Sequence, residues 1–129
     1  MKIEHIAIAA PSEKDSDKFF IELLGLKKVR TFSVPINLMV AFFGIKKEHE
    51  VIRYENEKIS AEVFITNDNS RTKDIFTHSC LLVKNRDELV EKASSMGFTV
   101  IKVSRKGSND YYLFIKDSFQ NLYEIKEEL

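Results

Sequence analysis

Apolar and polar residues alternate in short runs along most of the chain, and these runs recur in the same order. Residues 2–9 alternate as in a strand, and a stretch with helical spacing of apolar residues follows and ends at Gly25. A second apolar run over 76–84 is again followed by a helical stretch, which ends at Gly97. Strand-like segments follow each helix. The pattern therefore predicts a βαβββ unit that is used twice.

The boundaries of the predicted elements follow from capping and turn residues. In the first copy we expect strands over 2–9, 26–34, 49–55 and 59–66, with a helix capped by Ser12 and a turn at Asn56 and Glu57. In the second copy we expect strands over 76–84, 98–104, 111–116 and 121–127, with a helix that Asn85 caps and Glu88 supports three positions on. The polar residues 67–74 are expected to link the copies.

The two copies are nearly in register, but the first is longer. His78 follows His5 by 73 positions and Gly97 follows Gly25 by 72, whereas the first copy carries ten additional residues before its last strand. These fall in the segment 35–44, which opens with Pro and closes with Gly, as a short helix does. We therefore predict an inserted helix, with a buried strand as the alternative for an apolar run this short.

Composition narrows the function classes. The 129 residues include 20 basic and 20 acidic residues and have no net charge, which gives no electrostatic reason to expect a nucleic-acid partner. The single Cys80 cannot form an intramolecular disulfide, and the first residues lack the pattern of a signal peptide, so a cytoplasmic location is expected. Since no apolar stretch approaches the roughly 20 residues that cross a bilayer, no membrane span is expected.

Four polar residues on the predicted strands suggest a metal site. His5, Glu62, His78 and Glu124 each lie opposite a largely apolar face, so a curled sheet would gather them on its concave side. The assignment of Glu62 depends on strand register, because Glu50 on the neighbouring strand is the other candidate. Two imidazoles and two carboxylates would leave open positions on a divalent Ni, Co, Mn, Fe or Zn ion. Such an ion polarises a carbonyl, while a carboxylate transfers the proton of the adjacent carbon.

Each of these features also has a purely structural interpretation. A single His on a strand can be a hydrogen-bonded structural residue, and Cys80 is expected to be a small buried apolar group. Phe42 and Phe43 can belong to the core or line a substrate pocket. Arg105 can recognise a substrate carboxylate or phosphate, or lie on a solvated hairpin.

Five segments, spread over most of the chain, resemble the vicinal oxygen chelate superfamily. They are residues 3–8, 19–26, 61–64, 77–83 and 117–125. That superfamily contains glyoxalase I, methylmalonyl-CoA epimerase, extradiol dioxygenases and the fosfomycin and bleomycin resistance proteins. The resemblance implies an α+β fold of two βαβββ modules, 1–70 and 75–129, that form one domain over 1–129.

The resemblance also implies a site and an activity. His5, Glu62, His78 and Glu124 fall where glyoxalase I-like members place their metal ligands, and Glu124 or Glu62 would be the catalytic proton carrier. The implied activity is that of a metal-dependent lyase, isomerase or epimerase of a small substrate, in a homodimer. The alternative is a non-catalytic small-molecule binding protein of the bleomycin-resistance type.

Two departures from the family pattern bear on these expectations. Ser118 and Gln120 replace the Pro and Gly of the usual Asp-Pro-x-Gly-Asn hairpin. Ala9 and Ala10 stand where glyoxalase I has a cationic residue that holds glutathione, which argues against glutathione as the thiol. The inserted helix, with Phe42 and Phe43, is expected to reshape the cavity toward an apolar substrate.

Overall fold

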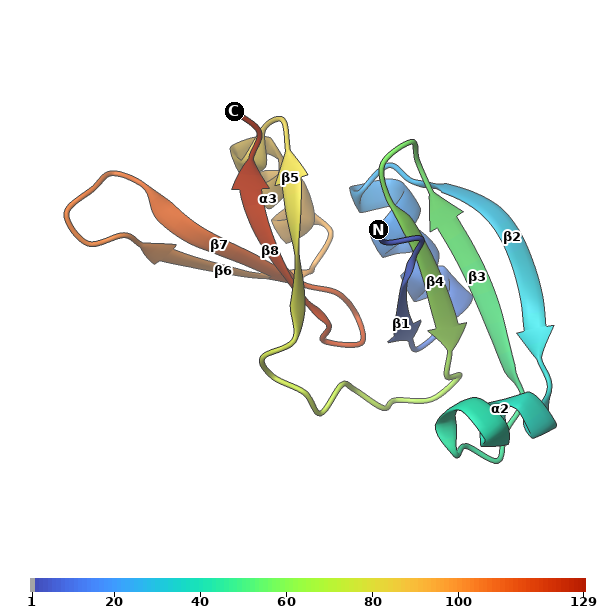
Figure 1. Cartoon of the computed structure of the whole chain (residues 1–129). Coiled ribbons are helices and arrows are strands. Elements are labelled where there is room, and N and C mark those ends of the chain that lie inside the picture. The colour runs from blue at the N-terminus through green and yellow to red at the C-terminus, as the bar shows by residue number, and fades with distance from the viewer. Residues whose placement is uncertain (1) are drawn as a thin grey trace. The chain divides into compact units, whose positions relative to one another are not determined.

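The computed structural model describes residues 2–129, and its element order is βαβββ in each half, as predicted (Figure 1). The first half contains β1 (Ile6–Ala10), α1 (Glu13–Asp17), the π-helical segment η1 (Lys18–Leu23), β2 (Lys27–Val34), α2 (Ile36–Phe43), β3 (His49–Glu55) and β4 (Ser60–Ile65). The second half contains β5 (His78–Val83), α3 (Arg86–Ser95), β6 (Thr99–Ser104), β7 (Tyr111–Lys116) and β8 (Leu122–Glu127).

Each half forms its own four-stranded mixed sheet with the same topology. The strand order is β1-β4-β3-β2 in the first and β5-β8-β7-β6 in the second. In both sheets the first and last strands of the half are parallel neighbours, and the remaining pairs are antiparallel. The chain divides into two compact units between Ser70 and Arg71, within the predicted link over 67–74. The α+β fold with two βαβββ modules is thus confirmed.

One face of each sheet packs against a helix and forms the core. In the first unit Ile52, Tyr54, Ala61 and Val63 are fully buried, and the ring of Phe20 stacks on Tyr54 with centroids 5.1 Å apart. In the second unit the buried side chains are Ala93 of α3 with Leu113, Ile115, Tyr123 and Ile125 of the sheet. The predicted polar residues lie on the other face of each sheet, here called the open face. In the first unit α2 reaches one end of this face, where the ring of Phe43 packs against that of Phe64 with centroids 5.4 Å apart.

The helix ends follow the predicted capping residues. The Ser12 hydroxyl accepts a hydrogen bond from the Asp15 amide at 3.1 Å, and the Asn85 side chain accepts one from the Glu88 amide at 3.0 Å. The inserted segment is a helix and not a strand: α2 begins after Pro35 and ends at Gly44, which adopts the left-handed φ of 70°. No helix within residues 2–129 is both long enough and apolar enough to cross a membrane.

The first strand of each half is shorter than predicted. β1 begins at Ile6 and not at residue 2, so His5 lies just before the strand, and β5 begins at His78. β1 is an edge strand that pairs with β4 from Ile6 opposite Ala61, and β4 extends only one residue further back, to Ser60, so the residues before His5 have no strand beside them to pair with.

The turn before β8 provides a test of backbone strain. Gln120, at the position of the family's Gly, has a left-handed φ of 68°, which costs a residue with a Cβ atom roughly 1 kcal/mol. We expect Gln120→Gly to raise the free energy of unfolding by about 0.5–1 kcal/mol, measured by chemical denaturation. Asn67→Gly is the matched control, because Asn67 has a φ of 57° but Asn tolerates this region. An equal or larger gain at Asn67 would contradict the explanation.

Candidate metal centre

In the first unit the structure brings His5 and Glu62 together. Ala7 pairs with Glu62 across the parallel strands β1 and β4, and His5 lies two residues before Ala7 on the same face. The His5 Nε2 atom is 3.6 Å from Glu62 Oε1. Glu50 pairs with Ile65 and is exposed at the opposite face, so Glu62 and not Glu50 is the partner of His5.

The second unit repeats this arrangement with His78 and Glu124. Cys80 pairs with Glu124 across β5 and β8, and His78 lies two residues before Cys80. The His78 Nε2 atom is 3.7 Å from Glu124 Oε2. The two halves therefore build the same pair of side chains from equivalent strands, with nearly the same distance between Nε2 and the carboxylate oxygen.

Both imidazoles are fixed through their other ring nitrogen. The Nδ1 atom of His78 is 2.8 Å from the carbonyl oxygen of Phe76, and that of His5 is 2.7 Å from a carboxylate oxygen of Glu4. Because a carbonyl and a carboxylate only accept hydrogen bonds, the hydrogen is assigned to Nδ1 in both rings. In the neutral rings, Nε2 then presents a lone pair to the neighbouring carboxylate, as in metal-binding histidines held by a second partner.

Each unit brings together one imidazole and one carboxylate, which are ligand types that divalent metal ions take. A ring nitrogen without hydrogen and a carboxylate oxygen repel each other at 3.6 or 3.7 Å unless a proton or a cation lies between them. An ion with bonds of about 2.1 Å to each atom fits such a gap. Among residues 2–129, however, no three His, Cys, Asp or Glu side chains gather closely enough to hold a metal. The structure thus brings the four predicted ligands together as two pairs, one in each unit.

Arg53 distinguishes the first pair from the second. Its guanidinium is 2.9 Å from Glu62 Oε2 and 2.8 Å from Glu4 Oε2. The hydrogen bonds from Arg53, followed by that from His5, lower the pKa of Glu4 to about 2. The three carboxylates around Arg53, which include Glu55, in turn raise the pKa of Arg53. Arg53 was not predicted as a site residue, because only the pairing of β3 with β4 places it opposite Glu62.

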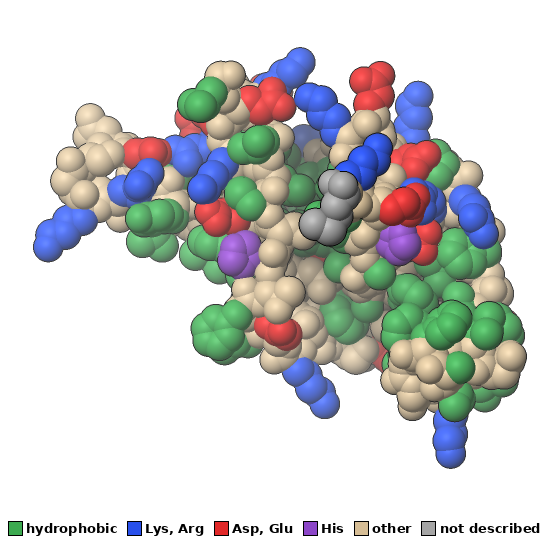
Figure 2. All heavy atoms as spheres, in the orientation of Figure 1, with side chains coloured by type: hydrophobic (Ala, Val, Ile, Leu, Met, Phe, Trp, Pro, Cys, Tyr) green, Lys and Arg blue, Asp and Glu red, His purple; other side chains and the backbone are tan. Residues whose placement is uncertain are grey.

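A pocket of about 280 Å³ opens beside the first pair. It is lined by His5, Ala7, Phe32, Val34, Phe42, Phe43, Glu62 and Phe64. Phe42 and Phe43 are 65% and 53% exposed, so they do not belong to the core. Figure 2 shows the hydrophobic side chains gathered over the α2 end of this sheet. Phe64 was not predicted as a lining residue, although its position two residues after Glu62 on one strand face gave the signal.

Two further residues from the sequence predictions are Cys80 and Arg105. Cys80 is exposed and not buried as expected, because it lies on the open face of its sheet beside Glu124. Arg105 lies after β6, 3.5 Å from an oxygen of Asp110 and over the ring of Tyr112.

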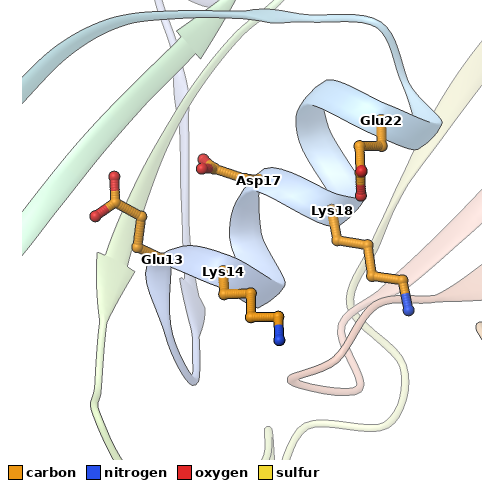
Figure 3. A pocket seen from close by; sticks show the side chains of 5 residues that line it. All are labelled: Glu13, Lys14, Asp17, Lys18 and Glu22. Atoms are coloured by element: carbon orange, nitrogen blue, oxygen red, sulfur yellow. The ribbon is translucent and has the colours of Figure 1, made fainter.

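A second hollow, of about 490 Å³, runs along α1 and η1 and differs from the first pocket because charged side chains line it (Figure 3). Its lining consists of Glu13, Lys14, Asp17, Lys18 and Glu22. Lys28 contacts both Glu13 and Asp17, at 2.5 and 3.0 Å, so two of the three acids already share one cation. Imidazole and thiol groups do not line this hollow, and we assign it no chemistry.

Comparison with known proteins identifies relatives of the whole chain. Residues 2–125 match the family model described as the Glyoxalase/Bleomycin resistance protein/Dioxygenase superfamily. No curated protein matches the chain.

Several solved structures share the fold. A glyoxalase family protein from Bacillus cereus has 18% identity and a TM-score of 0.72, over 100% of this chain and 95% of that chain. One from Enterococcus faecalis has 18% identity and a TM-score of 0.71, over 96% and 95%. The fosfomycin resistance protein FosX from Listeria monocytogenes has 11% identity and a TM-score of 0.71, over 100% and 94%. A mutant of this FosX was solved in complex with Mn(II) and 1S,2S-dihydroxypropylphosphonic acid.

Proposed function

Because the chain belongs to the Glyoxalase/Bleomycin resistance protein/Dioxygenase superfamily, we propose that it is a metal-dependent lyase, isomerase or epimerase of a small substrate. The observation that carries this proposal is the repeated His and Glu pair, with Nε2 to carboxylate distances of 3.6 and 3.7 Å in the two units. The pair stands at matching positions of both units, and in each unit the Nδ1 atom of the imidazole has a hydrogen-bond partner of its own, which leaves Nε2 directed at the carboxylate.

The proposed metal ligands are His5 and Glu62 in the first module and His78 and Glu124 in the second module of the proposed vicinal oxygen chelate domain. A bound divalent ion of Ni, Co, Zn, Mn or Fe would supply Lewis acidity toward two neighbouring substrate oxygens. Glu4 and the Phe76 carbonyl hold the two imidazoles in the tautomer that leaves Nε2 available. Glu124, or Glu62, takes the proton from the carbon next to the substrate carbonyl and returns it.

The pocket supports a substrate with an apolar body. Its walls are mostly aromatic and aliphatic, and its polar groups are His5 and Glu62 at one end. A ligand would therefore place its oxygens at this end and its apolar part against Phe42, Phe43 and Phe64. Arg105 is proposed as a substrate-binding residue within the second unit.

We also propose a cytoplasmic homodimer. The open face of the second sheet exposes apolar side chains, among them Leu82 at 64% and Val103 at 52%. Exposed apolar surface of this kind is covered in an assembly more often than it is left to solvent.

Metal content tests the proposal directly. Protein purified without added ions, and then dialysed against each candidate ion, should retain about one divalent ion per site by inductively coupled plasma mass spectrometry. The loaded protein should then convert at least one member of a panel of aldehydes, hemithioacetals and acyl-CoA epimers. Failure to retain any of these ions at micromolar concentration would remove the enzymatic proposal.

A binding protein of the bleomycin-resistance type is the second candidate. The exposure of Phe42 and Phe43 favours it, because exposed aromatic walls suit sequestration of a flat ligand without turnover. Ligand-induced quenching or a thermal shift without product formation, in protein that holds no metal, would select this candidate.

A further inference from the structure

The two His and Glu pairs differ in the residue that the neighbouring strand places opposite the carboxylate. In the first sheet β3 places Arg53 opposite Glu62. In the second sheet β7 places Phe114 opposite Glu124. The two positions correspond in the repeated topology, so the duplicated fold holds a cation at one and an aromatic ring at the other.

Arg53 holds its carboxylates tightly. Its side chain is only 16% exposed, and its guanidinium contacts Glu62, Glu4 and Glu55 at 2.9, 2.8 and 3.2 Å. The oxygen of Glu62 that Arg53 binds is Oε2, while Oε1 is the one that faces His5. Glu62 therefore has one oxygen in a charge-assisted hydrogen bond and one oxygen directed at the imidazole.

Glu124 is held more loosely. The ring of Phe114 packs edge-on against His78, with centroids 5.5 Å apart, and donates no hydrogen bond to the carboxylate. Among residues 2–129, the Lys or Arg nitrogen within 4 Å of this carboxylate is Lys126 Nζ, at 3.8 Å from Oε1, on a side chain that is 62% exposed. An exposed ammonium at this distance is strongly hydrated and restrains the carboxylate little.

This inference rests on the proposed function. We propose that Arg53 is a positioning residue that leaves Glu62 only one carboxylate oxygen for metal binding. Glu124, which has no such partner within the described part of the chain, can offer both of its carboxylate oxygens. The guanidinium also opposes a divalent cation through like-charge repulsion. The two carboxylates consequently take different roles. Glu62 is the more rigid ligand of the pair in the first unit, and Glu124 is the more mobile ligand of the pair in the second unit.

Substitution of Arg53 tests this inference through metal affinity. Arg53→Met should bind Mn(II) or Co(II) at least about tenfold more tightly than the wild type, equivalent to about 1.4 kcal/mol, by isothermal titration calorimetry. The gain arises because the repulsion is removed and a second oxygen of Glu62 becomes available. The absorption spectrum of bound Co(II) should change with it, since an additional oxygen alters the coordination.

Two matched variants separate positioning from a general structural effect. Arg53→Lys retains the charge and should stay within about threefold of the wild-type affinity. Phe114→Arg places a guanidinium opposite Glu124 and should weaken binding about tenfold. Thermal unfolding of each variant by circular dichroism establishes that it is folded.

The outcomes separate this inference from the proposed function. If the wild type binds metal and Arg53→Met binds it equally or more weakly, the inference fails and the proposed function stands. If the wild type binds no metal but Arg53→Met does, the restriction by Arg53 is supported and the metal-dependent function of the natural chain fails. If neither protein binds metal, both are overturned.

Discussion

The variants His78→Ala and Glu124→Ala are expected to weaken binding of a divalent ion by about 100-fold or more. Loss of an outer partner of a metal ligand already costs about 10- to 100-fold, so loss of the ligand itself should cost at least the upper value. Each variant removes one member of a pair that lies 3.7 Å apart on the open face of the second sheet. Titration of metal-free protein with Co(II) or Mn(II), followed by calorimetry, gives the affinity.

Glu127→Ala is the matched control for this prediction. Glu127 is on the same strand as Glu124 but three positions on, so it points to the other face, and it is exposed. Its removal takes away one negative charge without touching the His78 pair, and the affinity should stay within about twofold. Equal losses at Glu124 and Glu127 would mean that net charge, and not coordination, governs binding.

The local signals in the sequence predict most of the fold. Ser12 and Asn85 cap helices because their side chains accept amide hydrogen bonds within a few residues, a property that needs no tertiary context. The Pro35 and Gly44 boundaries of α2 are equally local. The start of β1 was wrong because it depends on where the partner strand β4 begins, which only the assembled sheet determines.

The site was predictable to the extent that it depends on strand alternation. Alternation places His78 and Glu124 on one face of their strands, and the parallel pairing of β5 with β8 brings them to 3.7 Å. Arg53 could not be found in this way, because its position opposite Glu62 depends on the register between β3 and β4. The exposure of Cys80 was missed because apolar neighbours in a strand do not reveal whether another element covers that face.

The turn between β7 and β8 is where a single substitution should cost the most stability. Asp117 is 4% exposed, and its Oδ1 atom accepts the amides of Phe119 and Asn121, both at 2.9 Å. Its Oδ2 atom accepts the Asn121 side-chain amide at 2.8 Å and the Tyr123 hydroxyl at 2.9 Å. This one carboxylate therefore satisfies four donors and fixes the chain just before the strand that carries Glu124.

Asp117→Ala is expected to lower the free energy of unfolding by about 3–4 kcal/mol, because buried donors lose a charged acceptor and a cavity remains. Asp117→Asn should cost less, since its remaining oxygen can still accept the two backbone amides. Asp68→Ala, at an exposed turn where the carboxylate accepts the Ser70 amide at 2.9 Å, should cost under about 1 kcal/mol. Urea denaturation of the metal-free proteins gives all three values. If Asp117→Ala cost no more than Asp68→Ala, the turn would not stabilise the sheet, and the geometry that presents Glu124 to a metal would need another source.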